Sequence, residues 1–223
     1  MAETITTPPL GWVLLRAGLA RATAALADFI SPPRCAACDD LLGRRAVFCA
    51  DCASAVTVSP IALAGTVSWV EWGGPVKEAV VRMKYGRRED VARALASLVE
   101  NRPPPQRSAA DLVMPVPLHP KRLAERGFNQ STHFARAFAR RSGVPLSTGR
   151  LSRRLDTAPQ AGKTGSERRT SLDGAFVAQN VEGLRVAVVD DVVTTGSTLA
   201  ACSDALRASG ARAVELYAFA RAI

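Results

Sequence analysis

The sequence lacks several features that would place it in a particular class of protein. No internal repeat is visible, and aromatic residues make up only 5% of the 223 residues. The longest stretch rich in apolar residues, 12–30, is interrupted by Arg16, Arg21 and Asp28, which argues against a membrane span. The first residues include Glu3 and no positively charged segment, so a secretory signal is not expected. We therefore expect a cytoplasmic protein with no membrane span.

Apolar residues nevertheless recur along 12–30 at helical spacing. This pattern predicts an N-terminal amphipathic helix, which Pro32 and Pro33 end. We expect the helix to dock on the protein itself, and a helix lying on a membrane surface is the alternative.

Acidic residues are scarce in one part of the chain. The net charge is +9, and residues 121–170 contain twelve Lys and Arg but three Asp and Glu, while the rest of the chain is balanced. This basic window predicts an anionic ligand or partner, although the same residues can simply form a solvated face. Its aromatic residues are only Phe128, Phe134 and Phe138, so a stacking platform for single-stranded nucleic acid is not evident.

Cysteine is also scarce, but four of the five cysteines form two Cys-x-x-Cys knuckles separated by ten residues. Four thiolates at this spacing can bind one tetrahedral Zn²⁺, and a module with so little apolar core needs its metal to fold. Two disulfides are the alternative, which a reducing cytosol disfavours, and paired knuckles make redox catalysis less expected. Cys202 shares a helical stripe with leucines and is expected in the core. The candidate metal ligands are Cys35, Cys38, Cys49 and Cys52.

Residues 186–198, with the sequence VAVVDDVVTTGST, are the most informative segment. Val186–Val189 has the pattern of a buried parallel strand, and two carboxylates, Asp190 and Asp191, follow it. A turn rich in hydroxyl groups then leads into a helix. N–H groups at a helix N-terminus favour an anion, and carboxylates accept hydrogen bonds from hydroxyls. The segment therefore suits a ligand with a phosphate and sugar hydroxyls; an ordinary turn whose Thr and Ser cap the helix is the alternative.

From residue 66 onward, segments typical of strands and helices alternate along the chain. This alternation predicts an α/β fold with a mostly parallel sheet flanked by helices. Ligands of such sheets bind beyond the carboxyl ends of the strands, so the loops after Val116 and Val189 are expected on one edge. A mobile loop is expected over 152–174. The predicted strands are 66–72, 111–116, 176–181, 186–189 and 213–219, and the predicted helices are 76–84, 90–100, 128–141 and 199–208.

The 186–198 segment resembles the phosphoribosyl pyrophosphate loop of type I phosphoribosyltransferases: an apolar strand, two acids, two variable positions and Thr-Thr-Gly-x-Thr. The resemblance implies that Asp190 and Asp191 hold the ribose hydroxyls as the catalytic pair, and that the turn wraps the 5′-phosphate. The segment's implied contacts to phosphoribosyl pyrophosphate are Val192, Val193, Thr194, Thr195, Gly196, Ser197 and Thr198.

Other segments resemble the competence protein F family, also called the ComF/GntX family, which is type I phosphoribosyltransferase-like. They are the cysteine knuckles, the tripeptide 84–86, residues 114–130 and residues 155–176, in the family's order. Ser171 departs from the asparagine that family members often carry.

This second resemblance implies further parts of a ligand site. Pro115 and Val116 would form the pyrophosphate loop, and Lys84 and Arg126 would contact the pyrophosphate. Residues 152–174 would form a hood over the site, and the knuckles would form an N-terminal double zinc ribbon. We expect a first domain over 1–58, with the N-terminal helix and ribbon, and a phosphoribosyltransferase-like domain over 59–223.

Two functions follow from these resemblances, and they are not exclusive. One is a Mg²⁺-dependent phosphoribosyltransferase, in which a nucleophile displaces pyrophosphate from phosphoribosyl pyrophosphate. The other is an accessory protein of competence and DNA uptake. It would bind single-stranded DNA through residues 121–170, or bind a DNA-uptake helicase. The phosphate loop would then act as a ligand sensor.

Overall fold

The computed structural model describes residues 32–43, 46–58, 65–102, 107–155, 172 and 174–222. The helix expected over 12–30 lies outside these residues, as does most of the loop expected over 152–174. Within the described ranges, no helix combines the length and the apolar character that crossing a membrane requires.

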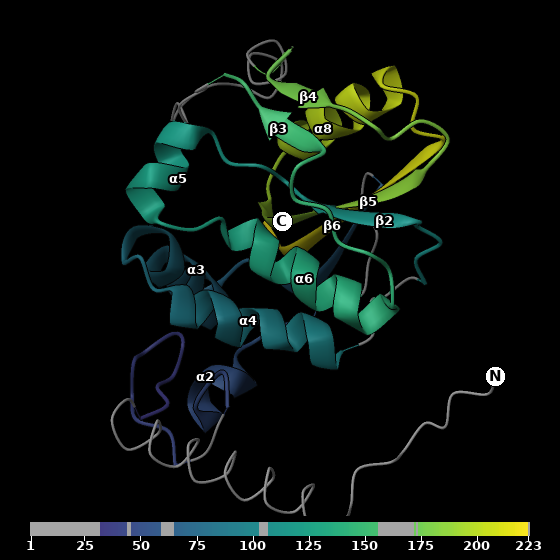
Figure 1. The fold of residues 1–223 in the computed structure, drawn as a ribbon. Helices are drawn as coiled ribbons and strands as arrows, with labels where there is room; N and C mark the ends of the chain where they lie inside the picture. The colour runs from purple at the N-terminus through teal and green to yellow at the C-terminus, as the bar shows by residue number, and fades with distance from the viewer. Residues whose placement is uncertain are drawn as a thin grey trace, which may run out of the picture.

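Among the described residues, four parallel strands form the central sheet (Figure 1). The middle of the sheet is apolar: in β5 every residue from Val186 to Asp191 is buried, as expected of a parallel strand covered on both faces. Beyond β2, Val113 forms one parallel bridge with Leu146. The predicted mostly parallel sheet is confirmed. In spatial order the strands are β1 (Thr66–Glu71), β6 (Ala213–Arg221), β5 (Arg185–Val193) and β2 (Leu112–Pro115).

Helices cover both faces of this sheet (Figure 1). Buried side chains of the helices on one face form a core with Val189 and Tyr217 of the sheet. On the other face, α8 (Ser197–Ala208) packs through Leu199 and Cys202, so Cys202 is a core residue as predicted. The helices of the first face are α3 (Gly74–Tyr85), α4 (Glu89–Asn101) and α6 (Gln130–Ser142).

The aromatic residues of α6 belong to the core. Phe134 stacks on Phe219 with ring centroids 4.7 Å apart, and Phe138 lies 4.5 Å from the ring of Tyr217. Both phenylalanines have no exposed surface. Because these rings are covered by the sheet, they cannot stack on the bases of a nucleic acid.

The strand that carries the two acids is longer than predicted. It was expected to end at Val189, but β5 continues to pair with β6 as far as Val193 opposite Arg221. β2 ends earlier, with Pro115 opposite Val189. β-branched residues after the acids favour the extended backbone. Asp190 and Asp191 therefore lie within the strand, just beyond the end of its neighbour β2.

Three short elements were not predicted. β3 (Leu151–Arg153) pairs antiparallel with β4 (Phe176–Ala178), so the loop expected from residue 152 begins as a strand. α2 (Ala50–Ser54) and α5 (Pro120–Arg126) are single short helices. Elements of three to seven residues are too short to show a hydrophobic period. α5 is nevertheless signalled by proline at its first position and by Gly127 in the left-handed region at its end.

The segment 32–58 packs directly on the rest of the fold. Cys35, Ala36 and Phe48 belong to the same hydrophobic core as the buried side chains of α3 and α4. At its other end, Val58 forms an antiparallel bridge with Val70 of β1. The cysteine-containing segment thus shares its apolar contacts with the α/β part of the chain.

Candidate functional site

The carboxyl ends of β5 and β2 bring the two candidate ligand loops together. The backbone N–H of Val116 donates to the carbonyl oxygen of Val189 at 2.9 Å. The segment after Pro115 therefore starts beside the residues that precede the acids. This is the arrangement expected from a parallel sheet, whose strands all end at one edge.

Asp191 is buried and forms an ion pair with Lys84. Its Oδ2 lies 2.6 Å from Nζ of Lys84, and the side chains are 5% and 21% exposed respectively. The contact is an ion pair without the angles of a hydrogen bond. Lys84 lies near the end of α3, so this helix supplies the charge that offsets the buried carboxylate. The resemblance implies that Lys84 contacts the pyrophosphate. In the structure its ammonium group contacts Asp191.

Asp190 is buried beside Asp191 but has different partners. Its Oδ1 accepts hydrogen bonds from Oγ of Ser131 and from the backbone N–H of Asp191, both at 2.9 Å. Burial raises the pKa of Asp190 to about 7, and the charge of Asp191 adds to this rise. Lys84 and the two hydrogen bonds oppose it. The pair thus holds less than two full negative charges near neutral pH.

Ser131 is a site residue that sequence reasoning missed. It lies at the start of α6, where the N-cap Asn129 accepts from the backbone N–H of Ser131 at 3.0 Å. The amide of Asn129 also donates to the carbonyl of Val116 at 3.0 Å. The sequence feature that could have indicated it is a polar helix start soon after the Pro115 loop. Such a start places the N-terminus of a helix dipole near the carboxyl ends of the strands.

Gln130, next to Ser131, is buried with an unsatisfied group. Gln130 is 4% exposed, and its Oε1 has no hydrogen-bond partner in the described part of the chain. Buried polar atoms without partners are uncommon and often occur at functional sites. The start of α6 therefore contains a hydroxyl bonded to Asp190 and, one residue earlier, a buried acceptor without a partner among the described residues.

The turn after β5 leads into α8 without a side-chain cap. Its N-cap residue is Gly196, with φ of 76°, a left-handed conformation that glycine adopts without strain. Among the described residues no side chain caps α8, and the hydroxyls of Thr195 and Ser197 lie 3.1 Å from each other. The alternative in which Thr and Ser merely cap this helix is therefore not observed. A recess of about 30 Å³ is lined by Asp190 and residues 192–199.

The remaining candidate ligand residues are Pro115 and Val116 at the end of β2 and Arg126 in α5. Pro115 and Val116 are buried at the end of β2. Arg126 is half-buried in the last turn of α5, and within the described residues it forms no ion pair. A larger cavity of about 540 Å³ adjoins this loop between α5, α6 and β3. Its lining is mixed, with proline and leucine side chains, the Phe128 ring and the cations of Arg136 and Arg153.

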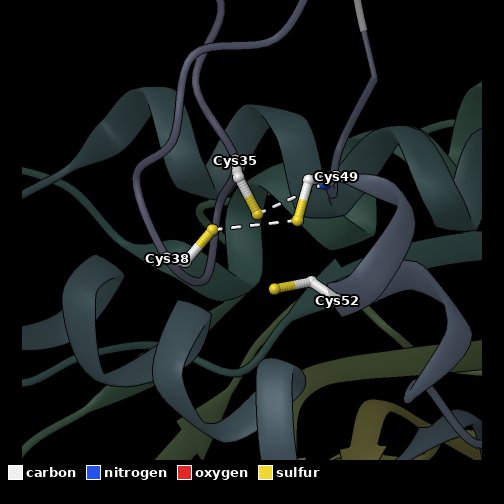
Figure 2. Close-up of side chains that lie close together, drawn as sticks. All are labelled: Cys35, Cys38, Cys49 and Cys52. Carbon is white, nitrogen blue, oxygen red and sulfur yellow. Dashed lines mark hydrogen bonds between the residues drawn. The ribbon is translucent and has the colours of Figure 1, made fainter.

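The four knuckle cysteines converge on one point, as Figure 2 shows. Their sulfur atoms all lie within 4.8 Å of one another, and Sγ of Cys38 is 3.8 Å from Sγ of Cys49. Tetrahedral zinc with Zn–S bonds of about 2.3 Å requires sulfur separations of about 3.8 Å. All four are free thiols, so the two-disulfide alternative is not observed. The residues present fit a tetrahedral metal ion.

Electrostatics favour the thiolate at Cys35, whereas the pKa values of Cys38 and Cys52 are raised by hydrogen bonds within the cluster and by burial. Although burial opposes it, backbone N–H groups of Cys38, Cys49 and Ala37 lower the pKa of Cys35 to about 6. The backbone N–H of Cys49 lies 3.4 Å from Sγ of Cys35. N–H groups that point at a sulfur stabilise the thiolate, which is the form that binds metal.

Comparison with known proteins identifies a matching domain family and relatives of this chain. The phosphoribosyl transferase domain family matches residues 128–223. The DNA utilization protein YhgH of Salmonella typhi is 33% identical over 163 residues, which are 70% of this chain and 72% of that protein. Competence protein F of Haemophilus influenzae is 32% identical over 157 residues, which are 66% of this chain and 69% of that protein.

Among solved structures, the glutamine phosphoribosylpyrophosphate amidotransferase of B. subtilis, complexed with ADP and GMP, is similar with 22% identity and a TM-score of 0.39. The match covers 57% of this chain and 25% of that one. The fold and the family match together define a phosphoribosyltransferase-type α/β domain accompanied by a four-cysteine cluster. The chain belongs to the competence protein F family, the ComF/GntX family.

Proposed function

We propose that the protein binds phosphoribosyl pyrophosphate at the carboxyl edge of the sheet. The observation that carries the proposal is the buried pair Asp190 and Asp191 near the end of β5, followed by the turn that leads into α8. The ribose diol suits the carboxylates, and the 5′-phosphate suits the N–H groups of the turn 194–198. Burying two acids costs stability, which supports a role in binding rather than in folding.

Each residue around the pair has a role in this proposal. Asp190 and Asp191 receive the ribose hydroxyls. Lys84 pairs with Asp191 and adds positive potential for the pyrophosphate, to which Arg126 also contributes. The loop at Pro115 and Val116 borders the pyrophosphate. The end of β5 and the turn that follows it contact the ligand through Val192, Val193, Thr194, Thr195, Gly196, Ser197 and Thr198.

We further propose that the bound ligand is a phosphoribosyl donor. A nucleophile forms a bond to the anomeric carbon, the bond from that carbon to the pyrophosphate oxygen breaks, and pyrophosphate leaves with the electron pair. Mg²⁺ would enter with the ligand and would neutralise charge on the leaving pyrophosphate. Asp190 and Asp191 lie where the ribose would carry developing positive charge, which they stabilise.

The experiment is an assay of pyrophosphate release with Mg²⁺, phosphoribosyl pyrophosphate and a panel of nitrogen bases and ammonia. Release that requires one acceptor, and that is lost in Asp190→Asn/Asp191→Asn, supports the transfer reaction. Binding of the ligand without release for any acceptor contradicts transfer and favours a ligand sensor.

A role in DNA uptake is the second candidate, because relatives are named for competence and DNA utilization. The basic window 121–170 would contact the phosphate backbone, while Phe134 and Phe138 are buried and take no part. Binding should then weaken steeply with salt, with a logarithmic slope of about 0.7 for each phosphate contact. Lack of binding to single-stranded DNA at low salt contradicts this role.

We propose zinc as the metal of the cysteine cluster, because four thiolates with this spacing are a typical structural zinc site. Cys35, Cys38, Cys49 and Cys52 would hold it and take no part in the chemistry. We also propose that the chain divides after residue 58 and acts in the cytoplasm, where the thiols stay reduced.

A further inference from the structure

Ion pairs connect the residue after the first cysteine knuckle to α3, the helix that carries Lys84. Asp39 directly follows the first knuckle, and its Oδ1 lies 3.3 Å from Nη1 of Arg82 on α3. The same oxygen lies 3.3 Å from both Nη1 and Nη2 of Arg88, the N-cap residue of α4. Arg82 and Arg88 lie on either side of Lys84 in the sequence. Asp39 therefore contacts both sides of the turn that follows Lys84.

Asp39 is itself fixed by the knuckle. Its backbone N–H donates to the carbonyl of Cys35 at 3.0 Å, and its carbonyl accepts from Nη1 of Arg34 at 3.0 Å. Its φ of 70° is in the left-handed region, which aspartate tolerates better than most residues. The surroundings maintain this backbone conformation, so the carboxylate is presented to α3 and α4 from a defined position.

The turn between α3 and α4 is tightly built. The N–H of Gly86 donates to the carbonyl of Arg82 at 2.9 Å, and a Cβ at position 86 would lie 2.6 Å from that oxygen. Arg87 has φ of 53°, and Arg88 also bonds Asp90 with distances down to 2.9 Å. A turn with so few alternative conformations transmits the position of its ends to the adjoining helix.

Apolar packing also connects the first knuckle to α3. Ala36 and Ala37, between the cysteines of the first knuckle, belong to one core with Val80 and Met83 of α3. Met83 directly precedes Lys84 and has no exposed surface. The knuckle therefore supports the end of α3 by packing as well as by charge.

We propose that Asp39 is a positioning residue for the ligand site. By holding Arg82 and Arg88, it fixes the end of α3 so that Lys84 meets Asp191. The inference rests on the proposed function, because Lys84 matters for a ligand only if Asp191 receives one. It makes the cysteine segment a support of the carboxylate pair, in addition to any role in stability.

The test compares Asp39→Asn with Glu78→Gln in the zinc-loaded full-length protein. Both substitutions remove one negative charge, but Glu78 is exposed on α3 and has no ion-pair partner among the described residues. Calorimetric titration with Mg²⁺ and phosphoribosyl pyrophosphate should show an affinity loss of about fivefold for Asp39→Asn and none for Glu78→Gln. Zinc content should equal that of the wild type in both. Equal affinities for the two variants overturn the inference.

A double-mutant cycle with Lys84→Met asks whether Asp39 acts through Lys84. Asp39→Asn should weaken binding in the wild-type background and cause no further loss beside Lys84→Met. The same loss in both backgrounds shows a general structural effect and contradicts positioning.

Amide hydrogen exchange over residues 82–88 gives a measurement that needs no ligand. Asp39→Asn should speed exchange there while leaving α6 unchanged, and unchanged exchange overturns the inference. If the wild type binds no phosphoribosyl pyrophosphate, the proposed function fails. The exchange measurement then decides by itself whether Asp39 holds the end of α3.

Discussion

The hydroxyl of Ser131 donates a hydrogen bond of 2.9 Å to Asp190, which joins residues 59 positions apart in the sequence. The bond links the start of α6 to the end of β5 inside the buried part of the site. One side-chain atom thus orients a carboxylate that the sequence marked for ligand binding, although the sequence did not mark Ser131.

Replacing Ser131 with alanine should weaken ligand binding without unfolding the protein. The variant loses one hydrogen bond to a charged or partly charged acceptor, so the affinity for phosphoribosyl pyrophosphate should fall about tenfold. Ser131→Thr, which keeps the hydroxyl, should recover most of the affinity. Ser142→Ala is the matched control, because the hydroxyl of Ser142 bonds the carbonyl of Phe138 at the other end of α6. Equal affinities for Ser131→Ala and Ser142→Ala contradict the assignment.

Removing the charge of Lys84 should destabilise the folded protein. Lys84→Met leaves Asp191 buried without its ion-pair partner, at a cost of about 2 kcal/mol in the free energy of unfolding. The double variant Lys84→Met/Asp191→Asn should recover much of this loss, because no uncompensated charge remains. Urea denaturation of the three proteins measures the effect. A double variant less stable than Lys84→Met speaks against charge compensation.

The raised pKa of Asp190 predicts a specific dependence of stability on pH. The carboxyl is protonated in the fold up to about pH 7, whereas in the unfolded chain its pKa is about 4. Between these values the folded state holds more protons, so this group's contribution to stability is complete below about pH 4. The contribution is lost as the pH rises through 7.

Asp190→Asn isolates that contribution, since asparagine does not titrate. The stability of the wild type relative to the variant should fall between pH 5 and pH 8, measured by chemical denaturation at each pH. A relative stability that rises over this range contradicts the direction of the shift.

Metal removal should affect the fold as well as the cysteine cluster. One zinc ion per chain is expected, and a chelator should lower the melting temperature because Cys35, Ala36 and Phe48 pack in the same core as α3 and α4. Cys49→Ser should reduce the zinc content, whereas Cys202→Ala, a core position on α8, should leave it at one. Metal analysis with thiol titration decides the matter; a zinc-free protein with oxidised knuckles contradicts the proposal.

The sequence predicted the sheet and its main helices because apolar residues mark them. The apolar run at Val186–Val189 and the helix expected over 76–84, with Val76, Val80 and Met83, are examples, and these residues are buried as expected. It did not predict that β5 extends past Asp191, since the extension depends on pairing with β6. That contact lies between segments far apart in the chain.

The candidate site was predictable only in part, and for a similar reason. Motif spacing identified the two acids, which are both buried in β5, and the four cysteines, whose sulfur atoms do lie together. Ser131 and Asp39 act through contacts with distant segments, and no local pattern distinguishes them from other polar residues. Lys84 was assigned to the pyrophosphate by resemblance, and its pairing with Asp191 requires the packing of α3 against the sheet.

The central claim is that Asp190 and Asp191 bind phosphoribosyl pyrophosphate. Its most direct test is calorimetric titration of Mg²⁺ and phosphoribosyl pyrophosphate into the wild type and into Asp190→Asn/Asp191→Asn. Saturable binding to the wild type is expected, with none to a folded double variant. Equal affinity for both proteins would contradict it.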